Sequence, residues 1–139
     1  MIIVAVIGVL SMIALPSFTD SVRKSRRSDA YAALTQIQQA QERWRANNPS
    51  YNADLTGAVA DGGLGLGGAS ASGYYSLALS NVGAAGYTVT ATAVSGTSQA
   101  SDSDCQKIML RWGGGNSFYT SADASDVVDT SGAKRCWNR

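Results

Sequence analysis

The amino-terminal part of the chain is almost continuously apolar. From Met1 to Leu15 only Gly8 and Ser11 interrupt the apolar character, which then extends to Phe18 and ends at Asp20. A membrane-spanning helix needs about 20 apolar residues, so this run is slightly short for a span. It lacks the cationic start and the small-residue cleavage site of a removed signal peptide. These features favour a helix that neighbouring copies of the protein bury.

A second, half-apolar stretch continues this helix. The chain has no Gly or Pro from Ser17 to Asn47 and is rich in Ala, Gln and Arg, which favours one continuous helix. Large side chains recur at steps of three and four residues and predict a stripe that packs on a sheet. The stripe consists of Tyr31, Leu34, Ile37 and Trp44, and Gln41 lies between the last two. A helix of this length reaches about 70 Å, so its amino-terminal half must be buried by something other than the globular part of the same chain.

The rest of the chain predicts a connecting loop and an antiparallel sheet. Residues 48–73 are rich in glycine and have no period, which is typical of a surface loop. Alternating apolar and polar residues predict three strands and, after a turn at Gly113–Asn116, a short fourth one. They are Tyr74–Leu79, Tyr87–Val94, Lys107–Trp112 and Ser117–Thr120. The expected fold is therefore α+β, with the helix over residues 23–47 packed on a small antiparallel sheet over residues 74–120.

Two cysteines lie in the carboxy-terminal third, and the chain has no histidine. Cys105 and Cys136 lack the spacing of a zinc site, so a disulfide that closes a loop over residues 105–136 is favoured over two buried thiols. A disulfide indicates an oxidising compartment. Closing a loop of about 30 residues stabilises a fold by about 3 to 4 kcal/mol in the chain-entropy model.

Charge is sparse and unevenly distributed. Charged residues make up 15% of the chain and the net charge is +1, which by bulk electrostatics argues against a polyanionic partner. A basic cluster follows the apolar run, where the half-apolar stretch of the helix begins. Its cations are expected to pair with nearby acids or with those of a neighbouring copy, and the residues concerned are Asp20, Arg23, Lys24, Arg26, Arg27 and Asp29.

Motifs for catalysis or metal binding are absent or weak. Without histidine there is no Ser-His-Asp or Cys-His arrangement, and the glycine-rich run Gly62–Gly68 lacks the lysine of a phosphate-binding loop. Two groups of acids could offer oxygen ligands to calcium, although solvated loop acids are the favoured interpretation. These groups are Asp102 with Asp104, and Asp123 with Asp126 and Asp129. We expect no enzymatic activity, no cofactor and no metal site.

A second basic group surrounds Trp137 at the end of the chain. It comprises Lys134, Arg135 and Arg139, which could contact DNA phosphates while the tryptophan ring stacks on a base. A tail packed beside the disulfide is the favoured interpretation.

Two segments resemble the type IV pilins. The conserved helix of that family is similar to VAVIGVLSMIALPSFTDSVRKSRRSDAYAAL, and its continuation into the connecting loop is similar to QAQERWRANNPSYNADL. A GYY strand, a GYTVTAT strand and a DC pair near the disulfide loop follow in the family's order. The resemblance spans nearly the whole chain and is strongest from Ile2 to Leu55. It implies the pilin fold and a subunit of an extracellular filament of the short-leader class.

The resemblance also implies different roles for the first 22 residues and for the rest of the chain. Residues 1–22 would sit first in membrane lipid and then in the filament core, and residues 23–139 would form the head. Gly8 and Pro16 bracket a segment that either unwinds when subunits pack or bends at the proline. The apolar core residues are Ile2, Ile3, Val4, Val6, Ile7, Val9, Leu10, Ile13, Leu15 and Phe18.

Family members begin with a methylated Phe after a Gly, followed shortly by a Glu that helps subunits dock. Since this chain has neither, we expect it to lack the first few residues of the mature protein. The implied partners are membrane lipid, the prepilin peptidase and the inner-membrane assembly machinery for the precursor. In the filament, the partners are other copies, DNA or host surfaces, in adhesion, twitching motility or DNA uptake. The alternatives are a type II secretion pseudopilin and a minor pilin that acts as a DNA receptor.

Overall fold

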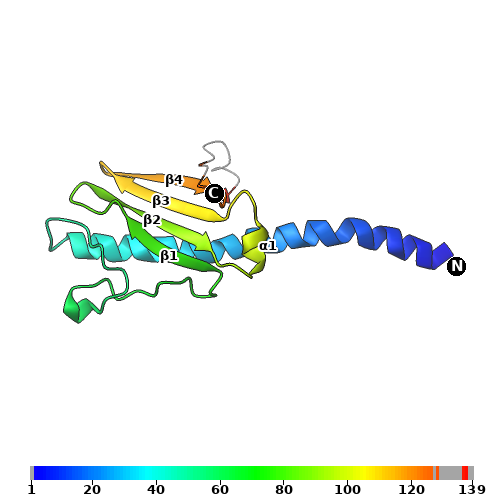
Figure 1. The fold of residues 1–139 in the computed structure, drawn as a ribbon, viewed down its shortest axis with the longest axis horizontal. Helices are drawn as coiled ribbons and strands as arrows, with labels where there is room; N and C mark the ends of the chain where they lie inside the picture. Colours follow the sequence, from blue (N-terminus) through cyan, green and yellow to red (C-terminus); the bar gives the residue numbers. More distant parts are fainter. Residues whose placement is uncertain (1, 127, 129–135, 138–139) are drawn as a thin grey trace.

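The fold is dominated by one helix that extends far beyond the rest of the molecule. The computed structural model describes residues 2–126, 128 and 136–137, with the backbone alone for residues 2–17. Helix α1 (Ile2–Arg45) is continuous through Gly8 and Pro16, and its first half projects from the head (Figure 1). Among the described residues, no helix has both the length and the apolar character needed to cross a membrane.

Four antiparallel strands form a meander in the order β1-β2-β3-β4. They are β1 (Tyr75–Ser80), β2 (Gly86–Ala93), β3 (Lys107–Gly113) and β4 (Asn116–Ala122). Two short 3-10 helices, η1 (Val59–Asp61) and η2 (Ser98–Ser101), lie in the connecting loops. Strand β4 is longer than the sequence predicted, because it pairs with β3 along all seven residues of both strands.

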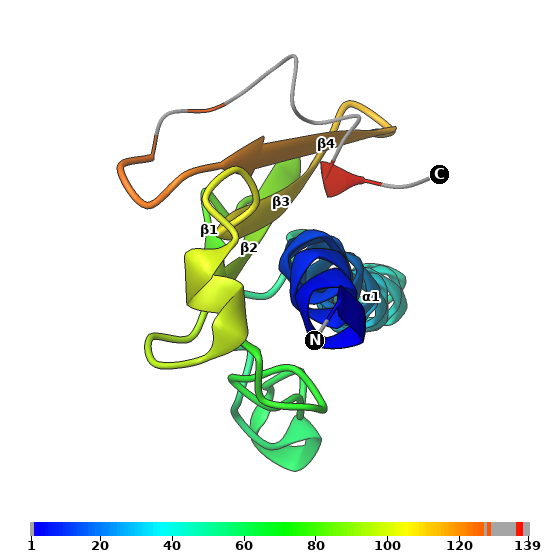
Figure 2. The ribbon, with the colours of Figure 1, turned by 90° about the vertical axis from the view of Figure 1, so that its right-hand side faces the viewer.

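Helix α1 covers one face of this sheet, as the view along the helix in Figure 2 shows. Leu34 and Ile37 are fully buried in one cluster with Val89, Ile108 and Leu110. Strand alternation sends these three sheet residues toward the helix, while the residues between them form the outer face, which we define as the face away from α1. The predicted α+β fold, a long helix on an antiparallel sheet, is confirmed.

The helix ends at Arg45, two residues before the predicted end. The Asn48 side chain donates a hydrogen bond to the carbonyl of Trp44 at 2.8 Å, and Arg45 donates to the carbonyl of Asn48 at 2.6 Å. The first contact gives the Trp44 carbonyl of the last turn a side-chain partner, and the second holds Arg45 against the segment that leaves the helix.

The predicted disulfide joins Cys105, which precedes β3, to Cys136 near the end of the chain. Both cysteines are buried, with exposed fractions of 1% and 0%. The bond therefore fastens the carboxy-terminal segment to the loop that follows η2.

Candidate functional site

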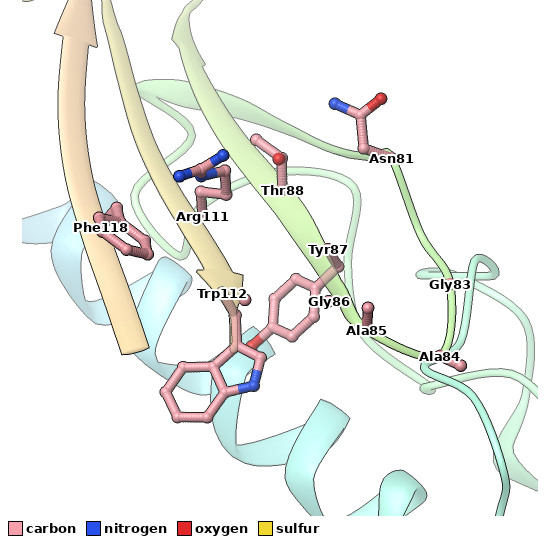
Figure 3. A pocket seen from close by; sticks show the side chains of 11 residues that line it. Asn81, Gly83, Ala84, Ala85, Gly86, Tyr87, Thr88, Arg111, Trp112 and Phe118 are labelled. Carbon is pink, nitrogen blue, oxygen red and sulfur yellow. The ribbon is translucent and has the colours of Figure 1, made fainter. Parts of the chain in front are cut away.

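A hollow of about 740 Å³ lies where two hairpin turns meet at one end of the sheet. The β1–β2 loop from Asn81 to Gly86 forms one wall, and Arg111 and Phe118 form another (Figure 3). In Figure 1 this end of the sheet lies opposite the amino-terminal end of α1. Among the described residues that line the hollow, Arg111 carries a positive charge and none is acidic. The hollow is therefore suited to an anionic ligand.

Arg111 and Phe118 form a cross-strand pair on the outer face. They are direct partners in the register of β3 and β4. The guanidinium carbon of Arg111 lies 4.6 Å from the centroid of the Phe118 ring, in a cation-π arrangement. Phe118 is 44% exposed, and Arg111 is exposed as well. The sheet thus presents a cation and an aromatic ring side by side to solvent.

Glycines permit the close packing of the two turns beside this pair. A side chain at Gly86 would come within 2.1 Å of the carbonyl oxygen of Trp112, so only glycine fits there. Gly114 and Gly115, in the β3–β4 turn, have φ angles of 59° and 79°, which favour glycine. The two turns themselves are consequently made mostly of small residues, while Tyr87 and Trp112 line the hollow next to them.

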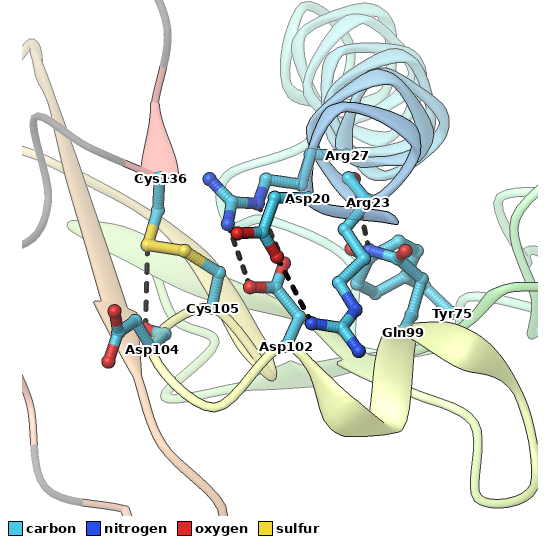
Figure 4. Close-up of polar contacts among 9 residues, drawn as sticks. All are labelled: Asp20, Arg23, Arg27, Tyr75, Gln99, Asp102, Asp104, Cys105 and Cys136. Atoms are coloured by element: carbon cyan, nitrogen blue, oxygen red, sulfur yellow. Dashed lines mark hydrogen bonds and ion pairs between the residues drawn. A yellow bond between two sulfur atoms is a disulfide. The ribbon is translucent and has the colours of Figure 1, made fainter. Parts of the chain in front are cut away.

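The basic cluster on α1 is largely engaged within the chain (Figure 4). Arg23 pairs with Asp20 at 3.3 Å, and Arg26 donates to Ser98 and lies over the ring of Tyr74. Lys24, the fourth cation of the basic cluster, is exposed. Asp29 accepts a hydrogen bond from the backbone of Ser72 at 3.1 Å.

Arg27 makes a buried ion pair with Asp102. Its Nε and Nη2 atoms each donate to a different carboxylate oxygen at 2.7 Å, in a bidentate arrangement. Burial lowers the pKa of Arg27, but the hydrogen bonds and charge of Asp102 outweigh burial, so the pKa lies above its ordinary value. The interpretation of Asp102 as a solvated loop acid was wrong, because only 6% of it is exposed. Arg27 therefore pairs with an acid that lies 75 residues away in the sequence.

A second set of hydrogen bonds lies next to this pair, and the backbone N–H of Asp102 donates to the carbonyl of Gln99 at 3.0 Å. Gln99 of η2 donates to the hydroxyl of Tyr75 at 2.7 Å and to the carbonyl of Arg23 at 3.3 Å. Burial raises the pKa of Tyr75 to about 12, with a smaller opposing effect from the Gln99 hydrogen bond. The cluster joins α1, β1 and η2 in one polar contact under the disulfide loop.

The raised pKa of Tyr75 predicts a loss of stability in alkali. The folded pKa of about 12 exceeds the ordinary value near 10, so the fold favours the neutral phenol. This contribution to stability is complete below about pH 10 and is lost as the pH rises through the folded pKa. The urea unfolding midpoint of the wild-type chain should decrease between about pH 10 and 12. In Tyr75→Phe this decrease should be smaller. An unchanged slope would show that Tyr75 ionises alike in the folded and unfolded chains.

Trp137 lies between two tyrosines beside the disulfide. Its ring stacks on Tyr31 at a centroid distance of 4.8 Å and lies 4.7 Å from Tyr119. Its indole nitrogen donates to the carbonyl of Thr120 at 3.0 Å. These contacts engage the ring in packing within the head. The basic residues predicted around it, Lys134, Arg135 and Arg139, lie outside the described residues.

The other predicted residues are placed as follows. Tyr31 packs on Trp137, Leu34 and Ile37 are buried in the core, and Trp44 is partly buried against it. Phe18 is 69% exposed on the projecting helix. The side chains of the core set from Ile2 to Leu15 lie outside the described part of the structure.

The acids considered as calcium ligands do not gather in the described part of the chain. Asp126 is 2.5 Å from the ammonium group of Lys107, and Asp129 lies outside the described residues. No three His, Cys, Asp or Glu side chains come together there in a group that could hold a metal ion.

One protein-family model matches residues 16–109, which is more than half of the chain. Its description is "Type IV minor pilin ComP, DNA uptake sequence receptor". The chain belongs to this family of type IV pilins. The matched part of the pilin contains the α1 head segment, the β1–β2 loop and the start of β3, but it ends before Arg111 and Phe118. No curated protein matches the chain. As a type IV pilin, the protein is a pilus subunit at the cell surface.

Sequence reasoning missed Arg111 and Phe118 as site residues. Arg111 lies within the predicted strand Lys107–Trp112 and Phe118 within the short predicted strand Ser117–Thr120, and nothing in either pattern marks a binding residue. The signal that could have found them was the glycine turn Gly113–Asn116, because its pairing sets Arg111 opposite Phe118.

Proposed function

We propose that this pilin is a minor pilin that binds duplex DNA in the hollow beside Arg111 and Phe118. The observation that carries the proposal is a hollow lined by one cation and an exposed aromatic ring, with no acid among its described lining residues. Arginine contacts both phosphates and base edges, and the small loop residues allow the DNA backbone to approach closely. The description of the matched family as a DNA uptake sequence receptor supports this choice of ligand.

The position of the hollow suits a receptor carried on a filament. If the projecting half of α1 is buried among neighbouring helices, the opposite end of the head stays open to solvent (Figure 1). The outer face beside the hollow also carries the half-buried Thr88 and Thr90, whose hydroxyls can donate to phosphate oxygens. DNA could thus be held without disturbing the helix that assembles the filament.

Arg111→Gln is expected to weaken DNA binding about 10-fold to 100-fold, within the range for loss of one arginine that contacts a base. The measurement is fluorescence anisotropy of labelled duplexes with the full chain in mild detergent, at fixed salt concentration. Lys24→Gln is the matched control, because it removes the same charge from an exposed site on α1 far from the hollow. Equal affinities for the two variants would contradict this placement of the site.

The carboxy-terminal basic group is the second candidate for DNA contact. Lys134→Glu combined with Arg135→Glu tests it with the same anisotropy assay. Unchanged affinity in that variant, with reduced affinity in Arg111→Gln, supports the hollow. The reverse result supports the carboxy-terminal group, although the Trp137 ring is already stacked within the head.

Assembly through α1 is the other part of the proposal. The core set from Ile2 to Phe18 would sit in lipid before prepilin processing and then pack against other copies, with Gly8–Pro16 unwound or bent. Cryo-electron microscopy of filaments sheared from cells tests this directly. Filaments built mainly of this chain would make it a major subunit for adhesion or twitching motility. If this chain is rare in filaments built of another pilin, it has the minor role. The family match favours either pilin role over that of a secretion pseudopilin.

A further inference from the structure

We propose that Phe118 determines sequence specificity as a wedge that enters the minor groove of bound DNA. In this arrangement the ring stacks on one base of a step that it partly opens, and Arg111 lies in the groove beside it. The inference rests on the proposed function, since it requires that duplex DNA occupies the hollow.

Packing within the head does not account for Phe118. Its neighbours on β4 point the other way: Tyr119 lies against Trp137 at the core, and Ser117 contacts Gln38 of α1. Phe118 lies outside the buried cluster that α1 and the sheet form, and 44% of it is exposed. Four large apolar side chains are exposed among the described residues, and of these Phe118 is the one with a cation over its ring. The ring is therefore held in place by Arg111 and remains partly exposed, which suits it to contact a ligand.

The geometry of the Arg111–Phe118 pair matches what a minor-groove wedge requires. Arg111 occupies one face of the ring at 4.6 Å, and no other aromatic or cationic contact to Phe118 occurs within the described chain. Since 44% of Phe118 is exposed, part of the ring can reach a base. Proteins that bend DNA insert apolar side chains such as Phe between base steps and place arginine in the narrowed groove.

The surroundings of the pair favour shape readout over direct reading of the major groove. This end of the sheet is built from two turns containing Gly83, Gly86 and Gly113–Gly115, which offer no side chains to base edges. Asn81 and Asn116 are the exposed amide side chains there, one in each turn. With so few groups to read bases directly, discrimination would come from the energy needed to open a step, which depends on its sequence.

The test compares two duplexes of equal length that differ only at the central step. One has a flexible TA step and the other a stiff GC step, and the full chain in mild detergent is used throughout. We expect the wild-type chain to bind the TA duplex about tenfold more tightly, the size of one favourable base-pair change. Phe118→Thr should bring the two affinities within about twofold. Phe118→Leu should keep most of the preference, because leucine also serves as a wedge.

A spectroscopic readout separates a wedge from a merely structural side chain. With 2-aminopurine at the central TA step, binding of the wild-type chain should increase its fluorescence as the base unstacks, and Phe118→Thr should not. If Phe118→Thr weakens both duplexes equally, or if fluorescence is unchanged on wild-type binding, the wedge is overturned while DNA binding stands. If the wild-type chain binds neither duplex, the proposed function fails together with the wedge.

Discussion

Asp102→Ala should lower the free energy of unfolding of the head by about 3 to 5 kcal/mol, the usual cost of removing one partner of a buried ion pair. Arg27 and Asp102 are 7% and 6% exposed, so the substitution leaves the guanidinium buried without its bidentate acceptor. Because η2 contacts α1 at this point and Cys105 follows Asp102 by three residues, η2 and the start of the disulfide loop should loosen together. Urea unfolding of the detergent-solubilised full chain, followed by tryptophan fluorescence, measures the change.

Two further variants show whether the loss of stability comes from the buried Arg27 charge that has lost Asp102. Arg27→Met combined with Asp102→Leu removes both charges and should recover most of the loss, since apolar pairs of similar volume often replace buried ion pairs at little cost. Arg23→Ala breaks the pair with Asp20, whose side chains are 29% and 66% exposed, and should cost at most about 1 kcal/mol. If Asp102→Ala costs no more than Arg23→Ala, the buried pair does not hold the loop on the helix.

Most of the fold could be predicted because it depends on local periods. Steps of three and four residues placed Leu34 and Ile37 on the buried side of α1, and two-residue alternation placed Val89, Ile108 and Leu110 on the inner face. Each of these patterns can be recognised within about ten residues of sequence. The disulfide was equally accessible, because only two cysteines are present to pair.

The Arg27–Asp102 pair could not be predicted in full because 75 residues separate its partners. The position of Arg27, one of the two partners, could nevertheless be predicted. Arg27 lies one turn before Tyr31 and two turns before Leu34, so the apolar stripe extended backward places it on the packed face. Which of several loop acids would meet it depends on the course of the β2–β3 connection, and no local pattern determines that course.

The candidate DNA site escaped prediction for a different reason. Sequence reasoning looked for DNA contacts in clusters of cations, and Arg111 is an isolated one. It gains significance only from Phe118 across the strand and from the β1–β2 loop beside it. Pairing registers and loop proximity are tertiary information, so a site built from one cation, one ring and bare turns leaves little trace in composition.

Removal of the disulfide should have an effect of comparable size to that of Asp102→Ala. Cys105→Ala combined with Cys136→Ala is expected to lower the free energy of unfolding by about 3 to 4 kcal/mol in the chain-entropy model. The bond closes a separation of 31 residues, and its loss returns that freedom to the unfolded chain. The midpoint of urea unfolding, compared between oxidised wild-type protein and the double variant, gives the value.

The position of Trp137 makes a second consequence of this change measurable. Its ring lies against Tyr31 and Tyr119 and directly follows Cys136, so the disulfide limits how far the ring can leave that contact. Without the bond, the near-ultraviolet circular dichroism of the folded chain should decrease as the ring becomes mobile. Trp137→Ala with the disulfide intact is the control, because it removes the same signal without opening the loop. A double variant that keeps both the wild-type spectrum and the wild-type midpoint would show that aromatic packing alone secures the end of the chain.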